Sequence, residues 1–476
     1  MECKNIECKN NNNKKKKRFE MDMCSGNLFW KIIVFSLPLM LMGILQLLYN
    51  AADLIVLGNF GSDKTAIGAV GSTGSLISLI VNLFMGLSVG TNVVCAKYFG
   101  AKDHEKISKV VHTSIIISFI MGLILGTFGF IFADDLLNLM SNDLELSRVY
   151  LKIYFIGMPF NLVYNFAAAV LRAVGDTKRP LYFLSIAGLA NVVLNIISVA
   201  IFKMGVAGVA YATIASQFIS CVLIMITLCK SKECYHFSFK QLKIDKHELA
   251  EILKIGLPAG IQSSIFSISN VIIQSSINKF GYIVMNGNSA ASSVEDFVYV
   301  SMESVYHASL AFTSQNVGAK NTKNIKKTTI YSLTIVTLIA VILGGTLFIF
   351  GKQAISIYTK VPDEIAVGYI RLHYLCLPYF LCGIMDVMVG ILRGLGYSTL
   401  PMIISIIGIC GFRISWIYGY FYQHTNFTDY NDLNLLYLSY PISWIITFAV
   451  QLTCYLILSK KKFKQIENEL ILESLL

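Results

Sequence analysis

Charged residues are scarce in this chain of 476 residues. Only 14% of the residues are Asp, Glu, Lys or Arg, whereas a soluble chain carries about 25%, and 55% are hydrophobic. So few charges cannot cover the surface of a soluble protein of this size. The composition therefore excludes a soluble enzyme, a disordered chain and a disulfide-stapled secreted domain, and it leaves a helical membrane protein.

The motifs of several common chemistries are also missing. There is no GxxxxGK[ST] run, so ATP does not drive this chain directly, and there is no HExxH or other histidine pair at metal-ligand spacing. No CxxC pair occurs among the eleven cysteines, several of which lie in apolar runs typical of buried, reduced thiols. We therefore expect no enzyme, no organic cofactor and no resident metal.

Long stretches without Asp, Glu, Lys or Arg are present instead. A bilayer core about 30 Å thick needs about 20 apolar helical residues, so each stretch indicates a membrane-spanning helix. Two further apolar stretches, 287–315 and 372–392, carry a few acids. The charge-free stretches are 32–52, 65–96, 110–133, 153–171, 180–202, 204–229, 255–278, 328–351, 394–412 and 433–459. The sequence therefore predicts twelve transmembrane helices.

Basic residues are concentrated in alternate loops. The opposite loops hold only five lysines, and this asymmetry follows the positive-inside rule. The basic set includes Lys97, Lys102, Lys106, Lys109, Arg172, Lys178, Arg179, Lys320, Arg393 and Lys460–Lys462. We therefore expect a multi-pass protein of the cell membrane with both termini in the cytoplasm, and we place Arg172 and Arg393 in cytoplasmic loops.

The N-terminal run CKNNNNKKKKRF, at residues 8–19, is strongly basic. Such a run can be a nucleic-acid-binding arm or a flexible anchor that fixes membrane topology, and its biased composition favours the anchor. We expect the partners to be the lipid bilayer and a small organic substrate, with no nucleic acid, and we expect a monomer.

Comparing the chain with itself reveals an internal repeat. Residues 169–180 read AVLRAVGDTKRP and residues 390–401 read GILRGLGYSTLP, an offset of 221. Leu-Pro dipeptides at 37–38 and 257–258, and Gly-Ala-Lys at 100–102 and 318–320, recur at nearly the same offset. Three anchors in the same order indicate two six-helix halves.

The repeat predicts an all-α architecture of two six-helix bundles. Because six is even, both halves enter the membrane from the same side, and a pseudo-two-fold axis along the membrane normal should relate them. The expected parts are a basic tail (1–28), an N-lobe (29–229), a cytoplasmic linker (230–254), a C-lobe (255–459) and a C-terminal tail (460–476). In secondary transporters of this plan, the substrate path lies between the repeats.

The order of several motifs resembles one transporter family. The motifs are LP…NAADLIVLGNFG in the first span, YFGAK after the second, LRAVGDTKRP after the fourth, GVAGVAYAT opening the sixth and QNVGAK after the eighth. Together they resemble the multidrug and toxic compound extrusion (MATE) transporters from about residue 30 to 460. The resemblance implies an antiporter that expels organic, often cationic and amphipathic, compounds in exchange for H⁺ or Na⁺.

Asp53 is the leading candidate for coupling export to an ion. A carboxylate at membrane depth costs about 2.5–3.5 kcal/mol on insertion scales, so it usually faces a cavity and serves a function. From the sequence alone, Asp53 could equally be a helix-end acid in interfacial water. By resemblance, it falls where the family's first-helix acid lies, and Pro38, fifteen residues earlier, is where that helix would bend.

Three further positions match the family's N-lobe cation or proton site. Asn191 and Asn195 are one helical turn apart, and Thr213 lies in GVAGVAYAT. All three offer oxygen atoms, which hard cations prefer, although ordinary interhelical hydrogen bonding would use the same side chains. Many family members carry an acid where this chain has Asn195. With one carboxylate fewer, the site is less suited to Na⁺, which favours H⁺.

The C-lobe carries polar residues in apolar spans. Where some members of the family carry acids, this chain has Phe266 and Cys382. The candidate cleft residues are Gln262, Glu303, Asp386 and Arg413, whereas Glu295 and Asp296 lie nearer the start of the eighth span, where a helix N-terminus favours acids. Glu303 and Asp386 could contact substrate or ion, or could form a plain buried ion pair with Arg413.

Other functions remain to be weighed against the antiporter. A flippase for a lipid-linked oligosaccharide shares the architecture, but it should carry basic residues that reach a pyrophosphate. Arg413 is the only base that the sequence places clearly inside a span, which favours the antiporter. A membrane enzyme should show His, Asp or Ser clustered at one depth, and none is found. A receptor or channel does not explain the duplication.

Overall fold

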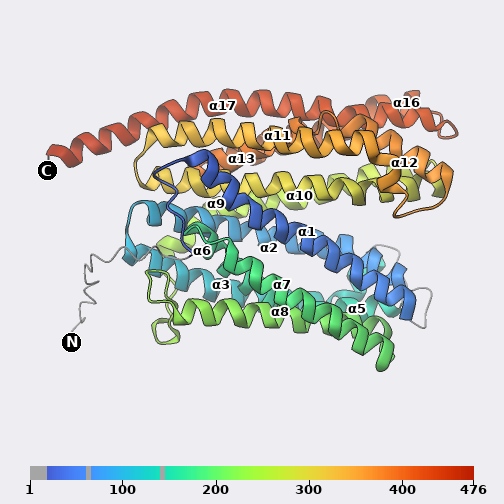
Figure 1. The fold of residues 1–476 in the computed structure, drawn as a ribbon, viewed down its shortest axis with the longest axis horizontal. Helices are drawn as coiled ribbons and strands as arrows, with labels where there is room; N and C mark the ends of the chain where they lie inside the picture. Colours follow the sequence, from blue (N-terminus) through green and yellow to red (C-terminus); the bar gives the residue numbers. More distant parts are fainter. Residues whose placement is uncertain (1–18, 61–65, 140–144, 476) are drawn as a thin grey trace.

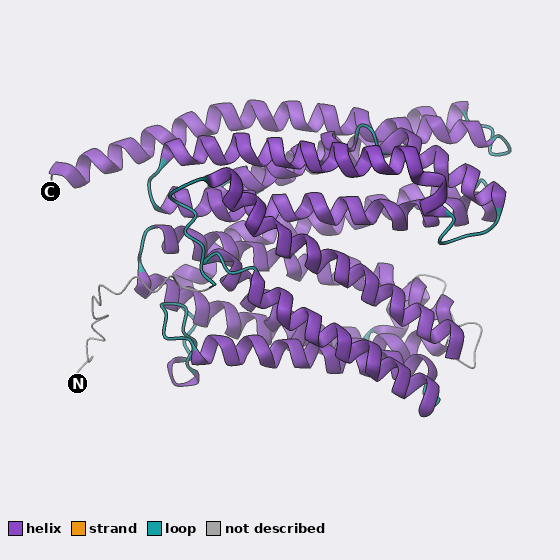
Figure 2. Cartoon of the chain, in the orientation of Figure 1, coloured by secondary structure: helices purple, strands orange, loops and turns teal. Residues whose placement is uncertain are grey.

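The computed structural model describes residues 19–60, 66–139 and 145–475, and the regular structure in these ranges is helical (Figure 2). The basic run at residues 8–18 therefore lies outside the described residues. The first half contains α1 (Leu28–Phe60), α2 (Ala66–Gly100), α3 (His104–Ile131), α4 (Ala133–Leu139), α5 (Glu145–Ile156), α6 (Met158–Ala173), α7 (Lys178–Asn195) with the π-helix η1 (Ile196–Ile201), and α8 (Gly205–Lys230).

The second half repeats this order. After the short 3₁₀-helix η2 (Phe239–Gln241) come α9 (Lys246–Asn278), α10 (Tyr282–Gly318), α11 (Thr322–Ile355), α12 (Pro362–Leu375) and α13 (Tyr379–Gly394). The next span contains α14 (Thr399–Ser405), η3 (Ile406–Gly411), α15 (Phe412–Trp416), η4 (Ile417–Phe421) and α16 (Tyr422–His424). The 3₁₀-helix η5 (Tyr430–Asp432) then leads into α17 (Leu433–Leu475).

Most of these helices are long and apolar enough to cross a membrane. Nine spans satisfy both conditions within the described ranges, and two bent pairs, α5 with α6 and α12 with α13, bring the number to eleven. The bends are 49° and 54°, and the two pairs occupy equivalent places in the two halves. α10 has 37 residues but is rich in serine, asparagine and acidic residues, and it is not among these spans.

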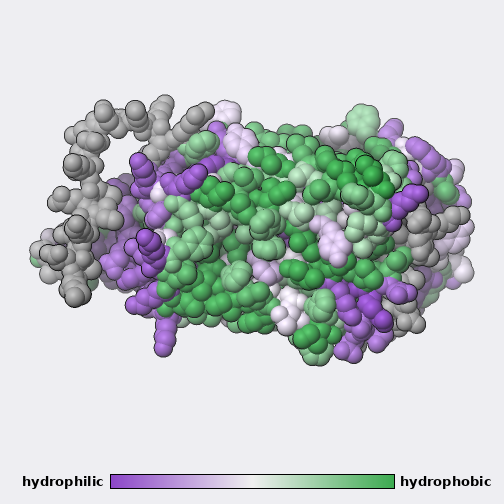
Figure 3. All heavy atoms as spheres, turned by 90° about the horizontal axis from the view of Figure 1, so that it is seen from below, coloured by the Kyte–Doolittle hydropathy of each residue, from purple (hydrophilic) through white to green (hydrophobic). Residues whose placement is uncertain are grey.

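The helices form two bundles that run side by side (Figure 1). One bundle contains α3, α5 to α8 and the other contains α10 to α17, with α2 and α9 between them. The N-terminal end of α1 and the C-terminal end of α17 lie at the same end of the molecule, which we call the termini end. On the face that Figure 3 shows, hydrophobic residues cover the middle of the molecule and polar residues gather toward its two ends, as a bilayer requires.

The repeat extends to backbone detail. Lys102 and Lys320, in the two Gly-Ala-Lys motifs, both adopt a left-handed conformation, with φ of 59° and 55°. Each is followed by a residue whose side chain caps the next helix, Asp103 for α3 and Asn321 for α11. Such side chains satisfy backbone N–H groups that the first helical turn leaves free. The two halves therefore solve the same local problem in the same way.

The bundles meet through glycines on α2, α9 and α10. A Cβ on Gly100 would overlap the carbonyl of Gln315, and a Cβ on Gly318 would overlap the carbonyl of Lys97, so α2 and α10 touch reciprocally near the termini end. A two-fold contact has this self-complementary form. Farther along, Gly86 and Gly260 bring the backbones of α2 and α9 together in the same way. The lobes are thus closed over the half of α2 nearest the termini end.

α1 crosses from one bundle to the other (Figure 1). Its first half packs in the C-lobe core, where the rings of Phe35 and Phe312 meet edge to face at 5.6 Å. Its second half packs in the N-lobe, where Val56 and Leu57 join the core under α8. Pro38 is buried within the first half, because Leu39 and Met42, which follow it, still pack in the C-lobe core. One helix is therefore anchored in both lobes.

The linker between the lobes is shorter than the sequence predicts. α8 ends at Lys230, and α9 already begins at Lys246, because the Asp245 side chain accepts hydrogen bonds from the backbone N–H groups of Glu248 and His247. These hydrogen bonds hold the pKa of Asp245 below its usual value, since they favour the charged carboxylate. The first turns of α9 therefore belong to the helix that lines the lobe interface.

Candidate functional site

A cavity of about 420 Å³ lies inside the N-lobe. Side chains from α1, α2, α5, α6, α7 and α8 line it, and most of the polar ones are amides and hydroxyls. Asp53 on α1 is the one carboxylate among the described residues that line it. No cationic side chain in the described ranges lies within ion-pair distance of Asp53. Its charge is therefore left to amides, water or a bound cation.

The predicted N-lobe residues on α1 and α7 form one hydrogen-bonded chain. The Asn195 amide nitrogen donates to Asp53 Oδ1 at 2.5 Å and to Asn191 Oδ1 at 3.2 Å. One helical turn separates Asn191 and Asn195, so both lie on the same face of α7. This face meets α1, and both side chains are buried. The Asn195 side-chain oxygen is buried without a partner in the described structure. The hydrogen bonds from Asn195 therefore link the carboxylate of Asp53 directly to α7.

The backbone changes character where this chain ends. α7 stops at Asn195, and the π-helix η1 follows immediately. A π-helical turn is rare and often marks a functional position, because it reorients the neighbouring side chains. The equivalent span of the C-lobe also contains π-helical turns, η3 and η4. The sequence carried no signal for these turns, since they conserve the apolar pattern of a span.

Thr213 lies on the cavity wall but outside the hydrogen-bonded chain. Its hydroxyl donates to the Val209 carbonyl on its own helix, at 2.9 Å. Gln217, one turn farther along α8, also lines the cavity, and its carbonyl oxygen is buried without a partner among the described residues. Gln217 is a candidate that the sequence reasoning missed. The i, i+4 spacing from Thr213 was the available signal.

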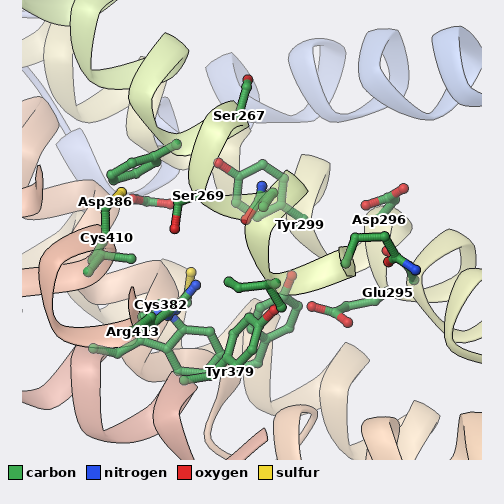
Figure 4. A pocket seen from close by; sticks show the side chains of 18 of the residues that line it. Ser267, Ser269, Glu295, Asp296, Tyr299, Tyr379, Cys382, Asp386, Cys410 and Arg413 are labelled. Atoms are coloured by element: carbon green, nitrogen blue, oxygen red, sulfur yellow. The ribbon is translucent and has the colours of Figure 1, made fainter. Parts of the chain in front are cut away.

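A cavity of about 520 Å³ lies in the C-lobe, and an adjoining cavity of about 330 Å³ lies between the lobes. They share six lining residues, and the smaller one also shares residues with the N-lobe cavity. The three spaces therefore adjoin in series. Figure 4 shows the larger one, which α10, α13 and the π-helical span line, with Asp386 and Arg413 on one side and Glu295 and Asp296 on the other.

The four predicted C-lobe residues all line one or both of these two cavities. Glu303 and Asp386 line both, Gln262 lines the smaller and Arg413 the larger. Arg413 does not form an ion pair with either acid within the described structure. Its guanidinium instead lies 3.9 Å from the centre of the Tyr440 ring and donates to a serine hydroxyl. The simple ion-pair explanation of Glu303 and Asp386 is therefore wrong.

Two other expectations about charge need correction. Glu295 is not near a helix start, because α10 begins at Tyr282. Its carboxylate instead forms a buried ion pair with Arg371 on α12, at 2.8 Å. Arg413 is not the only base at depth either. Arg172 and Arg393 line the interlobe cavity rather than cytoplasmic loops. They escaped the sequence reasoning because they stand in the last turns of α6 and α13, beside the loops.

Comparison with known proteins identifies the family of this chain. The family model described as MatE matches residues 38–197 and again residues 258–418, which is well over half of the chain. The chain belongs to the MATE family. The two matches begin at Pro38 and Pro258, so each lobe carries one copy of the family pattern. The MATE proteins are transporters rather than enzymes, and this chain is accordingly a multi-pass membrane transporter.

Several curated MATE relatives are similar over most of their length. The "Probable multidrug resistance protein YpnP" of Bacillus subtilis (strain 168) is 28% identical over 81% of this chain and 87% of its own. The "Probable multidrug resistance protein NorM" of Thermotoga maritima is 25% identical over 81% and 84%. The "Multidrug export protein MepA" of Staphylococcus aureus (strain MSSA476) is 23% identical over 80% and 84%.

Solved structures share the fold of this MATE transporter. A structure described as the "outward-facing conformation of a multidrug resistance MATE family transporter" matches with a TM-score of 0.82 at 22% identity, over 93% of this chain and 97% of that one. A structure described as "MATE in the straight conformation" matches with a TM-score of 0.83 at 22% identity, over 94% and 98%. These matches establish two six-helix bundles of the MATE type.

Proposed function

We propose that this MATE transporter is a secondary-active antiporter that exports organic compounds, cationic and amphipathic ones among them, in exchange for H⁺ or Na⁺. The observation that carries the proposal is Asp53, the one carboxylate among the described residues lining the N-lobe cavity. The relatives that are named as multidrug resistance and export proteins support the substrate class. The basic termini end faces the cytoplasm in this proposal.

The chemistry of the N-lobe cavity favours H⁺ over Na⁺. A site for a hard cation uses several oxygen ligands, and negative charge strengthens it. Here Asn195 presents its N–H₂ group, rather than an oxygen, to Asp53. A donor suits a carboxylate that alternates between charged and protonated, because burial favours the protonated form and the amide favours the charged one.

The proposed cycle couples Asp53 to rocking of the two lobes. When the interlobe cleft faces outside, Asp53 takes up a proton and its hydrogen bond to Asn195 weakens. This change reaches α1 and α7 together, and the cargo leaves the cleft. When the cleft faces inside, the proton is released. The ion gradient supplies the free energy, and the protein couples the two binding equilibria.

The decisive test is efflux by Asp53→Asn protein in liposomes. A pH gradient across liposomes with purified protein should drive dye export by the wild type, and Asp53→Asn should lower the coupled rate by about tenfold or more, because the amide cannot carry the proton. Dye binding should persist. Asp135→Asn, which alters an exposed acid on α4, is the matched control and should behave as wild type. Coupled efflux retained by Asp53→Asn would remove Asp53 from the mechanism.

The coupling ion is decided in the same liposomes. With internal and external pH equal, a Na⁺ gradient should fail to drive export if H⁺ is the coupling ion. A pH gradient without Na⁺ should be sufficient. Export that requires Na⁺ at equal pH would instead assign the Asp53 site to Na⁺.

A second candidate is a flippase for a lipid-linked oligosaccharide. The buried arginines of the interlobe cleft are the specific observation in its favour, because a flippase needs bases that can reach a pyrophosphate. Flipping of a fluorescent lipid-linked oligosaccharide in the same liposomes, without dye export, would favour this function over the antiporter.

A further inference from the structure

Two arginines related by the internal repeat face the same interlobe cavity. Arg172 stands in the last turn of α6 and Arg393 in the last turn of α13, 221 residues later. Both line the cavity of about 330 Å³. The pseudo-two-fold axis passes between the lobes, so the two guanidinium groups approach one space from its two sides. The internal repeat thus places one arginine from each lobe beside a single cavity.

Neither guanidinium has a carboxylate partner in the described ranges. Arg393 is only 5% exposed and donates to two neutral groups, the Tyr306 hydroxyl at 2.7 Å and the Gln262 carbonyl at 2.8 Å. Arg172 makes no side-chain hydrogen bond to any described residue. The Nε–H of each arginine is buried without a partner. Each guanidinium therefore has hydrogen-bonding capacity that no described protein group uses.

The helix ends account for only part of this arrangement. A helix C-terminus carries roughly half a negative charge, and it stabilises a cation in its last turn by about 0.3–1 kcal/mol. An isolated buried charge costs several kcal/mol and is normally matched by an opposite charge. Glu303 and Asp386 line the same cavity, yet neither lies within ion-pair distance of either guanidinium. The cavity thus has separate positive and negative groups.

We propose that Arg172 and Arg393 together bind an anionic group, a carboxylate or a phosphate, carried by an amphipathic substrate. Guanidinium groups bind such anions through paired, charge-assisted hydrogen bonds, and two of them that line one cavity without a carboxylate partner form a suitable receptor. The inference rests on the proposed export of organic compounds and specifies a substrate class for it. The cleft then accepts zwitterions and organic anions as well as cations.

A matched pair of dyes tests the proposal. Rhodamine B carries a free carboxylate on a cationic ring system, and its ethyl ester has the same ring system with that carboxylate masked. Binding to purified protein in nanodiscs of neutral phosphatidylcholine is measured by fluorescence polarisation. We expect Arg393→Gln and Arg172→Gln each to weaken rhodamine B binding by about tenfold or more, because a charged hydrogen bond is lost, and to change ester binding by less than about twofold.

The controls separate charge, folding and function. Binding of the ester reports that each variant is folded, and Arg393→Lys, which keeps the charge, should recover part of the rhodamine B affinity. Arg148→Gln, at an exposed ion pair with Asp134 outside the cleft, should leave both dyes unaffected. If the arginine variants lose affinity for both dyes equally, or for neither, the arginine site is wrong. Export of the ester by the wild type would then still support the proposed function. Failure of the wild type to bind or export either dye contradicts the proposed function itself.

A lipid arm distinguishes two sources of the anion. Nanodiscs that contain phosphatidylglycerol are compared with those of phosphatidylcholine alone. If the acidic lipid lowers rhodamine B affinity in the wild type but not in Arg172→Gln, the anionic group that the arginines bind includes a lipid phosphate. If affinity is unchanged, the arginines bind the soluble acid alone. Both results keep the anion site, and lipid competition that persists unchanged in both arginine variants argues against it.

Discussion

At the scale of single residues, charged side chains line internal cavities: Asp53 lines the N-lobe cavity, and Arg172 and Arg393 line the interlobe cavity. Asp53, Asn191 and Asn195 could be brought together because helical spacing and family resemblance both pointed there, and the structure joins them by hydrogen bonds. Arg172 and Arg393 were assigned to loops, because a count of apolar residues cannot distinguish the last turn of a buried helix from the loop that follows it. Burial of a charge is a tertiary property.

The buried pair of Glu295 and Arg371 leads to a prediction about stability. Glu295→Gln leaves the Arg371 guanidinium in the interior without its carboxylate, and loss of one partner of a buried pair costs about 3–5 kcal/mol. Asp134→Asn, which breaks ion pairs with Arg148 and Lys152 whose side chains are 31–50% exposed, should cost at most about 1 kcal/mol. Thermal unfolding in detergent should rank the two variants in this order, and equal midpoints would contradict the buried pair's importance.

At the scale of elements, α1 is the most informative helix. The sequence predicts a spanning helix with Pro38 inside it, and α1 is one helix that continues through Pro38. What the sequence could not show is that the two halves of α1 pack in different lobes, since both halves are equally apolar. The π-helical turns beside Asn195 were missed for the same reason. A hydrophobic pattern reports that a face is buried and not which neighbour buries it.

Pro38 and Pro258 offer a matched pair of substitutions. A proline inside a helix removes one backbone hydrogen bond and costs roughly 3 kcal/mol, so alanine at either site should raise the unfolding temperature. We expect Pro38→Ala to lower pH-driven efflux several-fold, because a stiffer α1 resists bending between Asp53 and the C-lobe. Pro258→Ala should lower it less, since the part of α9 that follows Pro258 carries no acid. Equal efflux by both variants would argue against bending at Pro38.

At the scale of the whole molecule, the duplication determines the architecture. The sequence repeat predicted two bundles with a common orientation, and the fold of solved MATE structures agrees with this arrangement. The closure of the lobes near the termini end could not be predicted, because two states of a transporter share one sequence. The closure depends on small residues at α2, α9 and α10, where backbone meets backbone.

The contact between α2 and α10 can be tested with one methyl group. In Gly318→Ala the new Cβ would overlap the Lys97 carbonyl, so the lobes could no longer close at the termini end without strain of about 1–3 kcal/mol. Efflux in liposomes should fall by about tenfold. Gly345→Ala, on α11 with no atom within 4 Å of the added Cβ, should transport normally. Normal efflux by Gly318→Ala would mean that the cycle does not require this closure.

Because α1 packs in both bundles, coupling through it between the N-lobe and the cleft must be reciprocal. If uptake of a proton at Asp53 loosens the grip of the cleft on its cargo, thermodynamic linkage requires the cargo, in turn, to loosen the grip of Asp53 on its proton by the same factor. The affinity of Asp53 for its proton should therefore fall as the concentration of a tightly held drug rises, and proton release on drug binding measures it. In a cell that contains more of the drug, the Asp53 site would therefore exchange its proton at a lower pH.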